Sequence, residues 1–96
     1  MIKLIRDNVH ETDSIELSGI EFKDAVLDNI SCTVNVIKTR QQTEDIINDV
    51  SDILELINVY LSTENIKAHD VLEKANQLRN ELGSYNKKLS IKSEIK

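Results

Sequence analysis

Forty consecutive residues, 43–82, contain neither Gly nor Pro, and apolar side chains recur along them at intervals of three and four residues. This interval is the repeat of one face of an α-helix. The sequence therefore predicts an all-α fold, either an elongated helical hairpin or a small helical bundle, with long antiparallel helices. We expect a single helical domain over residues 1–83.

The first half of this stretch carries the strongest apolar stripe. Polar residues such as Asp49 and Asp52 take the opposite side, as in an amphipathic helix. Leu56 and Val59 lie outside the stripe, so residues 53–61 are apolar nearly all round and are expected to contact something on two sides. We predict that the stripe, which also includes Ile47, binds a protein partner through Ile46, Val50, Ile53, Leu54, Ile57, Tyr60 and Leu61.

The first eighteen residues are expected to contain a helix and then a break. Ile2, Ile5 and Val9 share a helical face, which favours a helix over residues 3–12, although a short strand could also begin at Ile2. Gly19 marks the break before the long helical region. Ser18 and Glu21 have the spacing of a capping box, which predicts that the next helix starts here.

Two periods compete between residues 20 and 39. The helical set is Phe22, Val26, Ile30, Val34 and Ile37, and the alternating set, which is typical of a strand, is Ile30, Cys32, Val34 and Val36. We favour a helix over residues 20–39, because the helical pattern starts well before the alternation, and a strand over residues 30–37 is the alternative. The polar run at 38–43 predicts a turn between antiparallel helices, or else a polar patch within one continuous helix.

Residues 62–65 interrupt the apolar pattern, which resumes from Ala68 to Leu82. Ser62 or Thr63 is expected to cap this last helix, and Gly83 to end it. Asp70 and Lys74 have the spacing of an ion pair within a helix. Residues 84–96 are basic and weakly patterned, which predicts a mobile tail.

The net charge of −5 is unevenly distributed, because residues 87–96 carry +3 and residues 1–86 therefore carry −8. An acidic body argues against nucleic acid as a partner, since nucleic-acid affinity depends largely on cationic side chains. No run of residues is long and apolar enough for a membrane span or for the core of a signal peptide. We expect a cytoplasmic protein, and any export would not use a cleaved signal peptide.

Residues that could support catalysis or bind a metal are isolated. Cys32 is the single cysteine, and neither a histidine nor a basic residue stands near it in the sequence to activate it as a nucleophile. His69 stands one helical turn before Glu73, but no third ligand follows at a matching position. The acidic rows, Asp45, Asp49 and Asp52 on one helix and Glu21, Asp24 and Asp28 on another, are interpreted as solvent-facing. We therefore predict no enzymatic activity, no cofactor and no metal site.

Three parts of the sequence carry a resemblance to a known group. They are Leu17-Ser18-Gly19, the pair Tyr60 and Glu64, and residues 62–78. The chain resembles the small helical proteins of Gram-positive type VII secretion, which include WXG-type substrates and the WXG-like partners of LXG-domain toxins. The resemblance implies that Leu17 and Gly19 belong to a turn between two helices. It also implies that Tyr60 and Glu64 form an export signal, and that the chain forms a heterodimer with the helical N-terminal domain of a toxin.

Three hypotheses follow for function. The first is a non-enzymatic helical adaptor that packs its apolar stripe against helices of a larger protein. The second is an acidic inhibitor of a basic protein, such as an antitoxin, a bacteriocin-immunity protein or a phage anti-defence protein. The third is a helical domain that forms a homodimer through the stripe.

Overall fold

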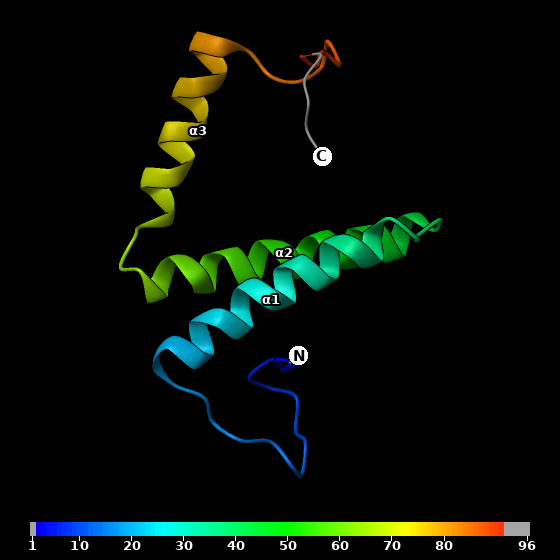
Figure 1. The fold of residues 1–96 in the computed structure, drawn as a ribbon, viewed down its shortest axis with the longest axis vertical. Coiled ribbons are helices and arrows are strands. Elements are labelled where there is room, and N and C mark those ends of the chain that lie inside the picture. Colours follow the sequence, from blue (N-terminus) through cyan, green and yellow to red (C-terminus); the bar gives the residue numbers. More distant parts are fainter. Residues whose placement is uncertain (1, 92–96) are drawn as a thin grey trace. The chain divides into compact units, whose positions relative to one another are not determined.

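The structure, a computed structural model, describes residues 2–91 and has three α-helices in that range (Figure 1). They are α1 (Gly19–Ile37), α2 (Thr43–Thr63) and α3 (Ala68–Leu82). Since residues 2–91 contain no strand, the all-α prediction is confirmed and the alternative strand over residues 30–37 is wrong. The chain divides into two compact units, Met1–Ile66 and Lys67–Lys96. The single domain predicted over residues 1–83 stays a prediction.

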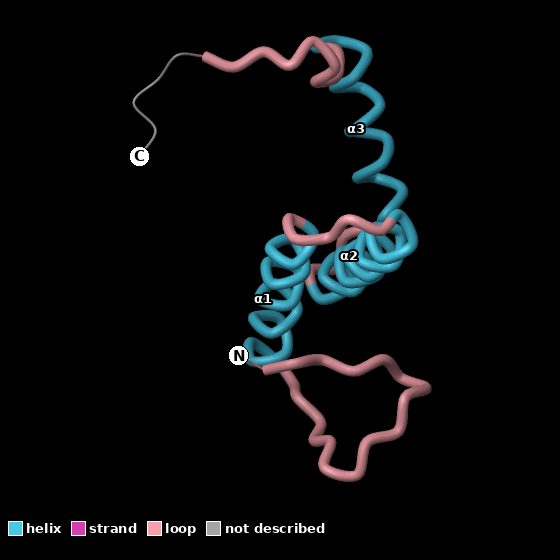
Figure 2. Tube along the Cα trace, turned by 90° about the vertical axis from the view of Figure 1, so that its right-hand side faces the viewer, coloured by secondary structure: helices cyan, strands magenta, loops and turns pink. Residues whose placement is uncertain are grey.

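Helices α1 and α2 pack together as an antiparallel hairpin, which Figures 1 and 2 show from two directions. The polar run between them forms the predicted turn and is not a continuation of one helix. The Thr39 and Arg40 amides donate hydrogen bonds of 2.9 and 3.0 Å to the carbonyl oxygens of Val36 and Ile37. These bonds span three residues, so they tighten the chain at the end of α1 and let it reverse.

The hairpin core is small. Val26 of α1 has no exposed surface and Ala25 is buried beside it. On α2, Ile46, Ile53 and Tyr60 are half-buried and share one side of the helix. Because α1 is the helix that packs on α2, we assign this side to the contact with α1.

The helix predicted over residues 3–12 is wrong. Residues 2–18 contain no helix, and residues 2–7 lie along the hairpin while the following residues form a loop that extends away from it (Figure 1). The Asn29 side chain accepts a hydrogen bond from the Leu4 amide at 3.2 Å and donates one to the Ile2 carbonyl at 2.8 Å. These tertiary hydrogen bonds replace the ones that a helix would have made within the segment.

The predicted turn between two helices at Leu17 and Gly19 is also wrong, because no helix precedes it in the described part of the chain. Gly19 is the first residue of α1 and has a φ of 59°, a conformation that Gly adopts readily. The Ser18 side chain makes no capping hydrogen bond, so the predicted capping box with Glu21 does not form.

Helix α2 runs through Thr63, and the prediction that Ser62 or Thr63 caps the last helix is therefore wrong. The Thr63 hydroxyl donates a 2.6 Å hydrogen bond back to the Tyr60 carbonyl. Asn65 follows with a φ of 57°, and the Ile66 amide donates a 2.9 Å hydrogen bond to the Leu61 carbonyl.

In the second unit, α3 matches the predicted helix and ends at Gly83 as expected. Gly83 has a φ of 82° and its amide donates a 2.8 Å hydrogen bond to the Arg79 carbonyl. The predicted pair of Asp70 with Lys74 is not among the ion pairs of the described residues. Residues 84–91 form no helix. The mobile tail stays a prediction, and its last residues, 92–96, lie outside the described range.

Candidate functional site

The middle of α2 is apolar on three sides, and the structure covers two of them. One side faces α1 through Ile53 and Tyr60. A second side, with Leu56 and Val59, lines a groove beneath the N-terminal segment. On the third side Leu54 is 59% exposed, so this part of α2 is in contact with solvent.

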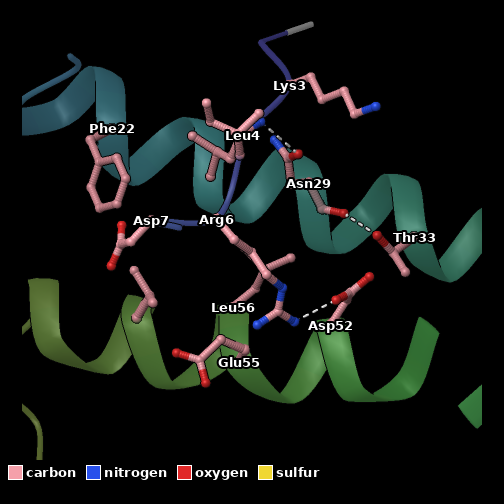
Figure 3. Close-up of a pocket in the computed structure, with 12 residues that line it drawn as sticks. Lys3, Leu4, Arg6, Asp7, Phe22, Asn29, Thr33, Asp52, Glu55 and Leu56 are labelled. Atoms are coloured by element: carbon pink, nitrogen blue, oxygen red, sulfur yellow. Dashed lines mark hydrogen bonds and ion pairs between the residues drawn. The ribbon is translucent and has the colours of Figure 1, made fainter. Parts of the chain in front are cut away.

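Residues 2–7 close the groove over one face of the hairpin, as Figure 3 shows. The groove has a volume of about 370 Å³ and lies between Leu4 of the segment, Phe22 of α1 and Leu56 of α2. Arg6 forms an ion pair with Asp52, and this bond ties the segment to α2, whereas Asn29 ties it to α1. One face of the hairpin therefore has a cover supplied by the same unit.

The exposed row on α2 has the spacing of a helix interface. Four apolar residues, separated by three, four and three positions, are between 38% and 59% exposed. This spacing keeps side chains on one side of a helix over several turns. The row consists of Ile47, Val50, Leu54 and Ile57.

Helix α1 carries a matching row. Ile20, Leu27 and Val34 recur every seven residues and are between 41% and 75% exposed. A seven-residue interval is close to two full helical turns, so the three side chains lie nearly in line. This row was not identified from the sequence, where the pattern from Phe22 to Ile37 grouped the exposed Val34 with residues of the buried side of α1.

The two rows lie on the same face of the hairpin. Leu27 directly follows Val26, and Leu54 directly follows Ile53. The row on α1 is therefore rotated by about 80–120°, and the row on α2 by about 40–120°, in the same direction from the line of contact between the helices. Two antiparallel helices are related by a local two-fold axis perpendicular to the plane that contains them. Rotation about this axis exchanges the two helices but does not turn the pair over. Rows that are rotated in the same direction from the contact line therefore lie on the same face of the pair.

We call this surface the open face. Residues that precede the contact line, such as Ala25 and Asp52, lie on the other face, and Asp52 there holds Arg6 of the N-terminal segment. The open face thus lies opposite the covered one. Its residues are Ile20, Leu27 and Val34 of α1 with Ile47, Val50, Leu54 and Ile57 of α2.

The predicted partner-binding residues divide between the two sides of α2. Val50, Leu54 and Ile57 lie on the open face. Ile46, Ile53 and Tyr60 are half-buried on the side toward α1, and Leu61 is buried. Their predicted role in partner binding stays a prediction, and the open face adds Ile20, Leu27, Val34 and Ile47 to the candidates.

Ion pairs fix the ends of the hairpin. Lys23 of α1 pairs with Glu64, the residue after α2, at 3.0 Å. The hydrogen bond that Lys23 donates to Glu64, followed by the negative charge of Glu64, raises the pKa of Lys23. At the other end, Arg40 of the turn pairs with Asp49 at 2.8 Å, and the bond to that carboxylate raises the pKa of Arg40.

The residues of the implied export signal lie at the end of α2. Tyr60 is half-buried, and Glu64 is occupied by its ion pair with Lys23. A receptor that recognised both side chains would have to replace this ion pair.

The acidic row of α2 is partly buried, whereas His69 of α3 is exposed. Asp49 is buried and paired, so the prediction that its row faces solvent is wrong at this position. His69 Nε2 lies 3.5 Å from Glu73 Oε2, and both side chains are exposed. Within residues 2–91, no three His, Cys, Asp or Glu side chains are grouped so that they could hold a metal ion.

None of the helices described is long and apolar enough to cross a membrane.

Comparison of the chain with known protein families, with curated proteins and with solved structures finds no match.

Proposed function

We propose that this protein is a non-enzymatic helical adaptor, which binds a helix of a larger protein on the open face. The observation that supports the proposal is the alignment of two exposed apolar rows on one face of the hairpin, opposite the face that residues 2–7 cover. Contiguous exposed apolar surface of this kind marks sites of interaction with other proteins. The surface that two packed helices form on one face can accept the apolar side of a third helix.

Within this proposal, the finer assignment is to type VII secretion. The chain would accompany the helical N-terminal domain of an LXG-type toxin, and Tyr60 with Glu64 would contribute to recognition for export. This assignment rests on the resemblance of the pair Tyr60 and Glu64 and of residues 62–78, since the turn between two helices implied at Leu17 and Gly19 is not formed. A gene for an LXG-type toxin directly beside the gene for this chain would support it.

The test is co-expression of the full chain with the helical domain that such a neighbouring gene encodes. We expect a heterodimer that survives high salt, because burial of apolar surface dominates the contact. Leu54→Asp should abolish the complex, since it places a charge in the middle of the open face. Asn48→Asp adds the same charge at an exposed position of α2 that points away from the open face, and it should leave the complex intact. A complex that forms equally well with Leu54→Asp would contradict the proposal.

The alternative is an acidic inhibitor of a basic protein, and the charge of −8 on residues 1–86 favours it. Such a complex depends on charge attraction, which salt screens. Its affinity should fall steeply between low and high ionic strength and should tolerate Leu54→Asp. Measurement of both effects on one complex separates the two functions.

A further inference from the structure

The open face has two different edges. About 60° and 100° beyond Leu27, on the side of α1 away from α2, stand Asp24 and Asp28. Both are exposed, and Glu21, one helical turn before Asp24, lies on the same side. The corresponding positions beyond Leu54 on α2 are Ser51 and Glu55. The open face is therefore bordered by three carboxylates along α1 and by one along α2. The bond to Asp52, and then the charge of Glu55, raise the pKa of Arg6, so the carboxylate of the α2 edge lies near a cation.

The three carboxylates of the α1 edge make no ion pair with a cation of the hairpin, although Asp24 adjoins Lys23. Glu21, Asp24 and Asp28 are in none of the ion pairs of the described residues. Helix α1 contains a single Lys, Lys23, which pairs with Glu64, and α2 contains neither Lys nor Arg. A partner that carries cations along this edge would therefore gain attraction that the chain itself does not supply.

We infer that the partner presents an amphipathic helix with Lys or Arg along one flank of its apolar stripe, and that this basic flank lies beside Asp24 and Asp28. This inference rests on the proposed function and specifies its partner. Asp24 and Asp28 are one helical turn apart, so two basic residues three or four positions apart on the partner helix match them. The other flank of the partner helix lies beside Ser51 and Glu55, where a single carboxylate near Arg6 calls for less positive charge.

A second copy of this chain fits the open face less well. The helices of its hairpin would bring apolar rows but no free cation to the edge of α1, and their own carboxylates would add like charges. The edge thus favours a different polypeptide, because like charges across an interface cost affinity and opposite charges set specificity.

The test uses two synthetic amphipathic peptides with the same apolar stripe, which carry either Lys or Glu along one flank. Their binding to the full chain is measured by fluorescence anisotropy at low and high salt. We expect the Lys peptide to bind about tenfold more tightly at low salt, as two or three exposed charge pairs allow. This preference should shrink at high salt, where exposed charges are screened.

The double variant Asp24→Asn, Asp28→Asn should remove most of the preference. The matched control, Asp13→Asn with Glu16→Gln, makes the same change of charge in the N-terminal loop and should retain it. Equal binding of the two peptides to the unmodified chain, or an equal loss in the control, would overturn the inference.

The variant Leu54→Asp separates this inference from the proposed function. If both peptides bind equally well and Leu54→Asp abolishes both, the adaptor function stands and the charged edge is irrelevant. If neither peptide binds, both proposals fail. Sedimentation of the free chain tests whether a second copy occupies the open face. A homodimer that Leu54→Asp dissociates would show that it does, and would overturn the inference.

Discussion

The Arg40 Nε atom donates a 2.8 Å hydrogen bond to Asp49 Oδ2 and so joins the turn of the hairpin to the second helical turn of α2. Asp49 is only 8% exposed, although its place among polar residues predicted a position in solvent. A buried carboxylate is costly unless a cation and hydrogen bonds compensate it. The pair therefore fixes the direction in which α2 leaves the turn.

Loss of the cation should destabilise the hairpin. In Arg40→Ala, Asp49 stays buried without its partner, so we expect a clearly lower melting temperature in thermal unfolding followed by circular dichroism. Asp49→Asn, which removes the charge that needs compensation, should restore much of the loss when combined with Arg40→Ala. The control is Arg6→Ala, which breaks the pair with Asp52, where both side chains are more than half exposed. A similar fall in melting temperature for Arg40→Ala and Arg6→Ala would contradict this prediction.

Asn29 should control the attachment of the N-terminal segment. Its side chain bonds to the Leu4 amide, the Ile2 carbonyl and the Ala25 carbonyl. Asn29→Ala removes all three bonds, and we expect faster hydrogen exchange at the Leu4 amide with little change in helix content. Asn35→Ala, on the exposed side of α1, provides the comparison. Unchanged protection of Leu4 in Asn29→Ala would mean that other contacts hold the segment.

Neighbouring residues of α2 should respond in opposite ways to the same substitution. Leu54→Asp changes an exposed position and should alter the free energy of unfolding by about 0.5 kcal/mol or less, while it abolishes partner binding. Ile53→Asp puts a charge into the contact with α1 and should cost several kcal/mol, on the order of 3 or more. Urea unfolding of both variants measures the difference. Equal stability losses would show that the open face is buried in solution.

Val26 should be the most sensitive position of the hairpin core. It has no exposed surface, so Val26→Ala removes two buried carbon atoms and leaves a cavity. We expect a cost of about 2 kcal/mol, which lowers the melting temperature of a domain of this size by roughly 10 °C. Val34→Ala makes the same change at an exposed site of α1 and should cost far less. A comparable cost at both sites would exclude the assigned core.

The ion pair of Lys23 with Glu64 should contribute to stability only below strongly alkaline pH. Because Glu64 raises the pKa of Lys23 in the folded state, the pair stabilises fully below the ordinary lysine value of 10.5. Its contribution is lost as the pH rises through the higher pKa of the folded state. Wild type should therefore melt above Lys23→Met at neutral pH, and the two curves should converge above pH 10.5. A constant difference up to the alkaline limit would contradict this.

Much of the fold could be predicted from local pattern. The three- and four-residue spacing of apolar side chains located α1, α2 and α3, and Gly83 marked the end of α3. These features depend on contacts within a few turns of the chain, so the order of residues contains them. The candidate surface was predicted in part, since Val50, Leu54 and Ile57 were included without the row on α1.

Tertiary structure decided which sides of these helices remain open. Asn29 and Asp52 draw residues 2–7 onto one face, and these partners are 25 to 46 residues away in the chain. They override the helical pattern of Ile2, Ile5 and Val9, because a side-chain partner outside the segment satisfies its backbone groups. In the same way, the sequence determined that α2 is apolar on several sides, and only the positions of α1 and the N-terminal segment decided that Leu54, and not Leu56, faces solvent.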